Sequence, residues 1–186
     1  MAILGVIATI AVIWLLAWLD ARRVEAAARQ LAADLRLAHT SATTQLADWR
    51  LIYAVDGSEY HLVKLDRECA AGCEAVGVSV DGDQVEQVFS RELPRGTKIV
   101  CSSNGSDPAN YRAEVQNLSS VALPEEVSTI EFNPDGTSYA ARGPNTGLRV
   151  ASESRSRLYK KLTVMAATSR VSINDGDCSG GNRDDY

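Results

Sequence analysis

The sequence has few histidines and lacks the short motifs that commonly mark enzymes and metal sites. Its two histidines, His39 and His61, lie far apart and have no partner motif. No Gly-x-Ser-x-Gly elbow occurs, and no glycine-rich loop that could cradle a phosphate follows a predicted strand. We therefore expect no enzyme, no catalytic or metal-binding residue and no cofactor, and we expect the two histidines to be surface or packing residues.

An excess of positive charge is also missing. The chain has 19 Lys and Arg against 24 Asp and Glu, which gives a net charge of −5. Nucleic-acid binding draws much of its affinity from neutralised phosphates, so no nucleic-acid partner is expected. Two Asp-Gly-Asp segments, at 81–83 and 175–177, resemble calcium ligands. Calcium needs a longer series of oxygens, so we interpret them as a hairpin turn and a solvated tail.

The first part of the chain lacks both charge and proline. No charged residue occurs from Met1 to Leu19, and no proline occurs in residues 1–46. Apolar residues then continue at spacings of three and four, so the pattern predicts one helix over 1–46, roughly 70 Å long. Such a helix is longer than a small domain, and its N-terminal half must protrude. The stripe expected to pack on the domain comprises Val24, Ala27, Ala28, Leu31, Leu35, Ala38, Ala42 and Leu46.

The protruding half of this helix has the length and apolarity of a membrane-crossing segment. It has no partner within its own domain, so we expect it to lie in a membrane first and then to be buried among copies of itself. Trp14 and Trp18 would be interfacial anchors in a bilayer and packed core residues in a filament. The residues expected to form this filament core are Ile3, Leu4, Val6, Ile7, Ile10, Val12, Ile13, Leu15 and Leu16.

Past the helix, period-two patterns separated by tight turns predict an antiparallel β domain over 47–174, followed by a polar tail over 175–186. The expected strands are 51–55, 59–65, 75–80, 84–89, 97–101, 127–132, 147–152, 159–166 and 170–174. The stretch 102–126 is rich in Ser, Asn and Pro and is expected to be a long surface excursion. Within it Asn104 and Asn117 match the glycan-acceptor pattern, and serine-linked sugars are an equal alternative.

Four cysteines, Cys69, Cys73, Cys101 and Cys178, follow the expected anchor. An even number in such a domain favours two disulfides and an oxidising compartment. Three pairings are possible, and we favour Cys69–Cys73 as a short loop with Cys101–Cys178 as a staple for the tail. The alternative is four free thiols in a cytosolic domain.

Several segments together carry a resemblance to a known family. The Phe-Asn-Pro-Asp-Gly motif is moderately specific, and it is more so in combination with the helix. The segments are Arg23–Ala38, Leu93–Val100, Ile130–Thr137, Leu162–Val164 and Thr168–Val171. On these residues the chain resembles the type IV pilin superfamily and, within it, the GspH/FimT-type minor pilins and pseudopilins. The resemblance implies an α+β pilin fold, in which a long N-terminal helix packs on an antiparallel β-sheet domain.

The resemblance also implies a function. It indicates a structural subunit of a type IV pilus-like filament, whose partners are its own copies or other pilins, the bacterial inner membrane before assembly, and the pilus assembly machinery. The final location would be a cell-surface filament or a periplasmic pseudopilus. A minor pseudopilin of a type II secretion system is the alternative. A DNA-uptake minor pilin is a weaker one, because the tail is acidic, and an ordinary membrane-anchored ectodomain is another.

Pilins of this family usually have a basic leader ending in Gly, then an aromatic residue or Met, and a Glu a few residues further on. Counting back along the helix from Val24 places Met1 some residues after the position where mature pilins of the family begin. If Met1 is instead near the mature start, Gly5 stands where the family has a Glu. Either the mature start precedes Met1 or this subunit lacks the Glu. The expectations of leader cleavage and N-terminal methylation depend on which of these holds.

Overall fold

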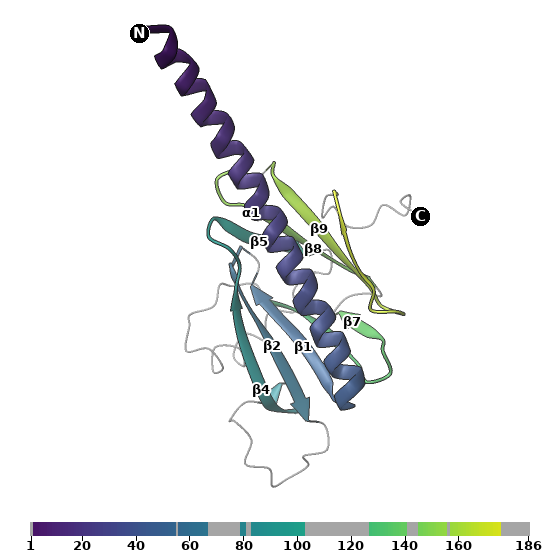
Figure 1. The fold of residues 1–186 in the computed structure, drawn as a ribbon. Helices are drawn as coiled ribbons and strands as arrows, with labels where there is room; N and C mark the ends of the chain where they lie inside the picture. Colours follow the sequence, from purple (N-terminus) through teal and green to yellow (C-terminus); the bar gives the residue numbers. More distant parts are fainter. Residues whose placement is uncertain are drawn as a thin grey trace.

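The structure is a computed structural model, and it describes residues 2–54, 56–66, 79–80, 83–102, 127–140, 145–155 and 157–175. It has one long helix, α1 (Ala2–Gln45), followed in the described ranges by ten strands. Figure 1 shows α1 packed along the strands over its C-terminal half and extending beyond them at its N-terminal end. The structure thus has a single helix over Ala2–Gln45, where the sequence predicts one over 1–46, and the N-terminal half of this helix protrudes.

The helix ends without a glycine. Leu46 adopts a left-handed conformation with φ of 52°, and the Ala47 amide donates to the Ala42 carbonyl over 3.3 Å. This is the six-to-one bond of a Schellman motif, which satisfies a carbonyl that the last helical turn leaves without a partner. Leu46 is 77% exposed, so its predicted place on the buried stripe is wrong. The left-handed turn rotates its side chain out of the helical register.

The strands form two antiparallel sheets. The larger sheet has the order β3-β4-β2-β1-β6-β7 and the smaller has the order β10-β9-β8-β5. The strands are β1 (Asp48–Ala54), β2 (Glu59–Asp66), β3 (Ser79–Val80), β4 (Asp83–Glu92), β5 (Thr97–Ser102), β6 (Val127–Phe132), β7 (Ser138–Ala140), β8 (Asn145–Ser152), β9 (Tyr159–Met165) and β10 (Val171–Asn174).

The first predicted hairpin is present, with Tyr53 paired to Tyr60 next to the turn. An Asp-Gly pair between two strands is typical of a type I′ turn, in which both residues have positive φ, but here only Asp56 does, with φ of 62°. The strand β7 was not predicted, because its three residues are too few to show an alternation of polar and apolar side chains. Of the predicted strand 75–80, only Ser79 and Val80 lie within the described residues.

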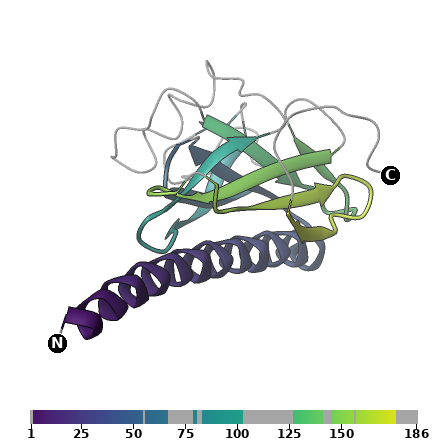
Figure 2. The same cartoon turned by 90° about the horizontal axis from the view of Figure 1, so that it is seen from above.

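The two sheets lie on the same side of α1 and share one core with it (Figure 2). The Ile99 amide donates to the Gly57 carbonyl over 2.9 Å, which joins β5 to the β1–β2 turn. The Ser138 amide donates to the Ala166 carbonyl over 2.8 Å and joins the other ends of the sheets. The buried helix stripe packs on both sheets, and its members are Val24, Ala27, Ala28, Leu31, Leu35, Ala38 and Ala42.

Core residues come from both sheets in comparable measure. The larger sheet contributes Leu51, Tyr53, Leu62, Ile130 and Phe132, and the smaller contributes Ile99, Leu148, Val150, Leu162 and Val164. The small residues of the helix stripe allow α1 to approach both sheets closely, while leucines at 31 and 35 fill the space between them. The second half of α1 is thus part of the globular domain, and it holds the first half in place outside it.

Candidate functional site

The N-terminal half of α1 exposes large apolar side chains. Trp14 is 78% exposed and Leu15 is 55% exposed, although tryptophan and leucine side chains are mostly buried in folded domains. Val12, Leu16, Trp18 and Leu19 are exposed as well. The predicted core residues Val12, Leu15 and Leu16 therefore lie on an accessible surface of the protruding helix.

This exposed surface extends around the helix. Successive residues of an α-helix point about 100° apart, so Trp14, Leu15 and Leu16 cover very different directions. The other predicted core residues lie on the same helix, but their side chains are outside the described part of the structure: Ile3, Leu4, Val6, Ile7, Ile10 and Ile13. Among the described residues, no helix has the length and apolarity needed to cross a membrane.

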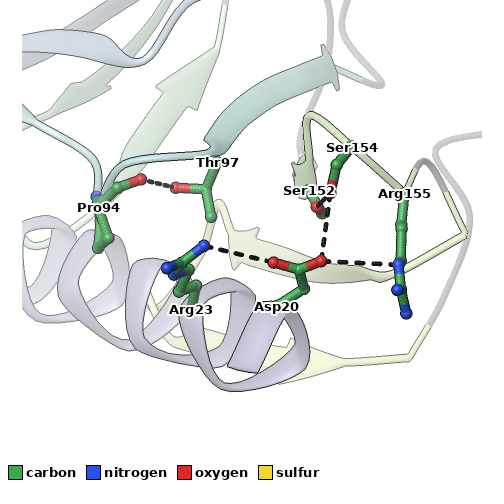
Figure 3. A network of polar contacts seen from close by, with 7 residues as sticks. All are labelled: Asp20, Arg23, Pro94, Thr97, Ser152, Ser154 and Arg155. Atoms are coloured by element: carbon green, nitrogen blue, oxygen red, sulfur yellow. Dashed lines mark hydrogen bonds and ion pairs between the residues drawn. The ribbon is translucent and has the colours of Figure 1, made fainter. Parts of the chain in front are cut away.

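Asp20 lies at the point where the helix leaves the domain. Its Oδ2 accepts a hydrogen bond of 3.2 Å from the Ser154 hydroxyl and lies 3.6 Å from Nε of Arg155. Its Oδ1 lies 3.4 Å from Nη1 of Arg23, one turn further along α1 (Figure 3). The Asp20 side chain is 18% exposed. The carboxylate thus joins the helix to the β8–β9 loop at the upper end of the buried stripe.

The two loops beside Asp20 are themselves tied together. The Glu153 amide donates to the Gly96 carbonyl over 3.0 Å, which joins the β8–β9 loop to the β4–β5 turn. Within that turn, the Thr97 hydroxyl donates to the Pro94 carbonyl over 2.6 Å. Figure 3 shows Pro94 and Thr97 of this turn beside α1, in the same view as Asp20 and Ser154. A loop held in this way can restrain the direction in which the half-helix leaves the domain.

A second polar junction fixes α1 to the larger sheet. The Tyr60 hydroxyl donates to Oδ2 of Asp34 over 2.5 Å and accepts from Nε2 of Gln30 over 3.1 Å. The same Gln30 amide lies 2.9 Å from the Glu92 carbonyl. Burial and the hydrogen bond to Asp34 raise the pKa of the Tyr60 phenol above its usual value. The junction sets the rotation of the helix about its own axis.

The Phe-Asn-Pro-Asp-Gly motif forms a tight turn after strand β6. The Gly136 amide donates to the Asn133 carbonyl over 3.1 Å, and Gly136 has a φ of 87°, which favours glycine. The hydroxyl and amide of Thr137 donate to Oδ1 of Asp135 and lower the pKa of that carboxyl. The Ser169 hydroxyl donates to the Gly136 carbonyl over 2.9 Å, so the turn is locked to the β9–β10 turn.

Both histidines are packing residues. His61 is 1% exposed, its Nδ1 lies 3.0 Å from the Ser90 hydroxyl, and burial lowers the pKa of its imidazole. The ring of His39 packs near Phe132, with centroids 6.3 Å apart. Within the described ranges, no three His, Cys, Asp or Glu side chains gather as metal ligands.

Other predicted sites fall outside the described part of the chain. Cys69, Cys73, Cys178, Asn104 and Asn117 are not among the described residues, and Cys101 is described only as part of strand β5. The same holds for Asp81 in the first Asp-Gly-Asp segment and for residues 176–186 of the predicted tail. Asp175 is described, and its carboxylate pairs with the Lys160 ammonium over 2.5 Å.

Sequence reasoning missed a buried ion pair. Nη2 of Arg50 lies 2.7 Å from Oε2 of Glu131, and the two residues are in register on β1 and β6. Both faces of β1 are buried, because every residue of the strand is buried. An arginine on such a strand is not expected from its polarity alone. The pairing partner also lies far away in the sequence, and no local signal identifies it.

Of the comparisons with known proteins, the one with solved structures found similar chains. No protein-family model matches the chain, and no curated protein matches it. A structure of the minor pseudopilin EpsH from the type II secretion system of Vibrio cholerae is similar over 82% of this chain and 96% of its own, with 11% identity and a TM-score of 0.51. A second EpsH structure is similar over 84% of this chain and 98% of its own, with 11% identity and a TM-score of 0.51.

A structure of the type IV minor pilin FimU from Pseudomonas aeruginosa aligns over 89% of this chain and 96% of its own, with 15% identity and a TM-score of 0.46. At identities this low, the likeness to EpsH concerns the fold. The chain has the pilin fold, with one long N-terminal helix packed on antiparallel sheets. The fold implied by the sequence resemblance to GspH-like members of the type IV pilin superfamily is therefore confirmed.

Proposed function

We propose that this chain is a structural subunit of a type IV pilus-like filament and that it polymerises through its apolar N-terminal half-helix. The observation that carries the proposal is the exposure of Trp14, Leu15, Leu16 and Trp18 around a helix that stands free of its own domain. Large contiguous apolar surface of this kind marks an interaction site. The pilin fold presents it in a form that several copies can share.

The partners in this proposal are other copies of the chain or other pilins. The inner membrane holds the half-helix before assembly, and an assembly machinery extracts it. Burying one large apolar side chain away from water contributes about 1.5–3 kcal/mol. Transfer from lipid to a filament gains much less, because lipid is also apolar, so close packing and a motor must drive extraction. The final location is a cell-surface or periplasmic filament.

The experiment is to replace Leu15 with Asp and to examine sheared cell fractions by electron microscopy. Leu15→Asp places a charge on the half-helix, where it has no partner within the described structure, and filaments should be lost while the domain stays folded. The matched control is Leu46→Asp, since Leu46 is equally apolar and is exposed at the other end of α1. Normal filaments from Leu15→Asp would contradict the proposal.

A second candidate is a minor pseudopilin of a type II secretion system. The observation that favours it is the similarity to EpsH, a minor pseudopilin of that system, of which two structures align over 96% and 98% of their own chains. Abundance separates the candidates. A major subunit should dominate the sheared filaments by mass, whereas a minor one should be rare there and should depend on another pilin for its incorporation.

A further inference from the structure

The end of the domain from which the half-helix emerges is rich in arginine. We call the set Arg22, Arg23, Arg95, Arg155 and Arg157 the arginine ring. Arg22, Arg95 and Arg157 are exposed, and the side chains of Arg23 and Arg155 are 54% and 39% exposed. The ring concentrates positive charge in a chain whose overall net charge is −5.

The fold brings the members of the ring together from three segments. Arg22 and Arg23 lie on α1, and Arg155 lies beside Asp20 on the domain side of the helix. Arg157 lies within the turn that the Leu158 amide closes on the Arg155 carbonyl at 2.9 Å. Arg95 precedes Gly96, whose carbonyl accepts from the Glu153 amide. The arginines therefore border the root of the half-helix on its domain side and on its solvent side.

Few carboxylates oppose this charge at the same level of the helix. In the described structure, they are Asp20, which is held by the three contacts given above, and the exposed Glu153. Glu25 is paired to Arg29 at 2.6 Å. Glu92 lies at the level of Gln30, roughly 15 Å further along α1. The end face of the domain thus carries more positive than negative charge.

Two indole rings lie next to the arginine ring on its apolar side. Trp18 is exposed, and the guanidinium carbon of Arg22 lies 5.3 Å from the centre of its ring. Trp14 lies one turn nearer the N-terminus and is more exposed still. Along the helix the order is therefore apolar residues, then indoles, then arginines. Tryptophan is enriched where a membrane helix crosses the interface between hydrocarbon and water.

We propose that the arginine ring, with Trp14 and Trp18, is a docking surface for the anionic phospholipid headgroups of a bilayer. The inference rests on the membrane stage of the proposed function and adds the depth and orientation of the subunit. The described apolar side chains between Val12 and Leu19 point in several directions around the helix, which suits a surrounding lipid phase better than one protein neighbour. Guanidinium groups bind phosphate oxygens through paired N–H donors, and basic groups at a membrane surface attract anionic lipid.

The test is vesicle flotation of the full-length chain, reconstituted from detergent. One set of vesicles is pure phosphatidylcholine, and the other is an equimolar mixture of phosphatidylcholine and phosphatidylglycerol. The wild type should bind the anionic vesicles more strongly, and salt should reduce this preference because it screens exposed charges. The Arg95→Gln/Arg157→Gln double variant should reduce the preference on the order of tenfold and leave binding to pure phosphatidylcholine unchanged.

The charge-matched control is Arg36→Gln/Arg170→Gln. Arg36 donates to the Val171 carbonyl next to Arg170, and it lies roughly 24 Å along α1 from Asp20. This double variant removes the same charge away from the ring and should keep the preference for anionic vesicles. Equal binding of the wild type to both vesicles, or an equal loss in both double variants, would overturn the proposal.

The ring could instead meet the acidic surface of a neighbouring subunit. In that case Arg95→Gln/Arg157→Gln would disrupt filaments and leave the vesicle preference unchanged, and that result would refute the lipid assignment. Failure of the ring proposal is separable from failure of the proposed function. Filaments that are lost with Leu15→Asp support the filament role whatever the vesicles show, and a vesicle preference in a chain that forms no filament supports only the docking surface.

Discussion

The Ser154 hydroxyl donates a hydrogen bond of 3.2 Å to the Asp20 carboxylate, although the two residues are 134 positions apart in the sequence. The contact joins the upper end of the helix stripe to the loop between β8 and β9. Asp20 is also the first charged residue after the apolar run. The same side chain therefore ends the apolar segment in the sequence and anchors it to the domain in space.

Removing this anchor should loosen the root of the half-helix without unfolding the domain. Asp20→Ala loses three partly exposed polar contacts, which are worth roughly 0.5–1 kcal/mol together, so the Tm should fall by about 2 °C. Amide hydrogen exchange should become faster around residues 20–24 and in the β8–β9 loop. Glu25→Ala, which breaks an exposed pair on the helix alone, is the control and should leave the loop amides protected. Unchanged exchange in Asp20→Ala would argue against an anchoring role.

The buried stripe of α1 should supply much of the stability of the domain. Leu31 is fully buried between helix and sheets, so Leu31→Ala should lower the free energy of unfolding by about 2–5 kcal/mol. Leu37 lies on the same helix but is 51% exposed, and Leu37→Ala should change stability by less than about 0.5 kcal/mol. Urea unfolding of the two variants measures the difference. Similar losses from both would mean that the stripe is assigned to the wrong face.

Local patterns in the sequence were enough to predict the helix and most strands. The spacing of Val24, Leu31 and Leu35 identifies a face of α1, and period-two alternation between turns marks β2 and β9. The Asn133–Gly136 turn was predictable because each of its residues has a conformational preference of its own. These features depend on neighbours within a few positions, and such neighbours are visible in a sequence.

Long-range relationships could not be predicted in the same way. The division into two sheets depends on which strands pair, and β5 pairs with β8 across a segment of more than forty residues. The Arg50–Glu131 pair depends on the pairing of β1 with β6. The Asp20–Ser154 bond depends on how the β8–β9 loop packs against α1. The burial of Leu46 was predicted wrongly, because its left-handed backbone conformation is usually adopted by glycine and a leucine gives no sign of it in the sequence. The arginine ring was missed because its members come from three segments, none of which is strongly basic by itself.

The cysteine pairing remains a prediction from the sequence. Peptide mapping under non-reducing conditions should show Cys69 joined to Cys73 and Cys101 joined to Cys178. The longer loop should contribute about 4 kcal/mol on the loop-entropy model, and the shorter one much less. Cys178→Ser should therefore lower stability far more than Cys73→Ser, as measured by urea unfolding without reductant. Four free thiols in protein isolated from cells would contradict both the pairing and the oxidising compartment.

The Tyr60 junction predicts how stability changes at alkaline pH. An unfolded tyrosine ionises near pH 10, and burial together with Asp34 raises the pKa of the folded phenol above that value. Below pH 10 both states keep the proton, so the contribution of Tyr60 is fully present. Above pH 10 the unfolded state loses the proton first, so the free energy of unfolding should fall as the pH rises toward the folded pKa.

Tyr60→Phe should cost about 1 kcal/mol at neutral pH through the lost hydrogen bond, and its alkaline loss of stability should be shallower than in the wild type. Asp34→Asn keeps an acceptor for the hydroxyl but removes the negative charge, so it should reduce the alkaline fall by a smaller amount. Urea unfolding between neutral pH and pH 11 measures all three proteins. If wild type and Tyr60→Phe lose stability in parallel across this range, the junction does not hold the phenol protonated, and its place in orienting α1 on the larger sheet must be reconsidered.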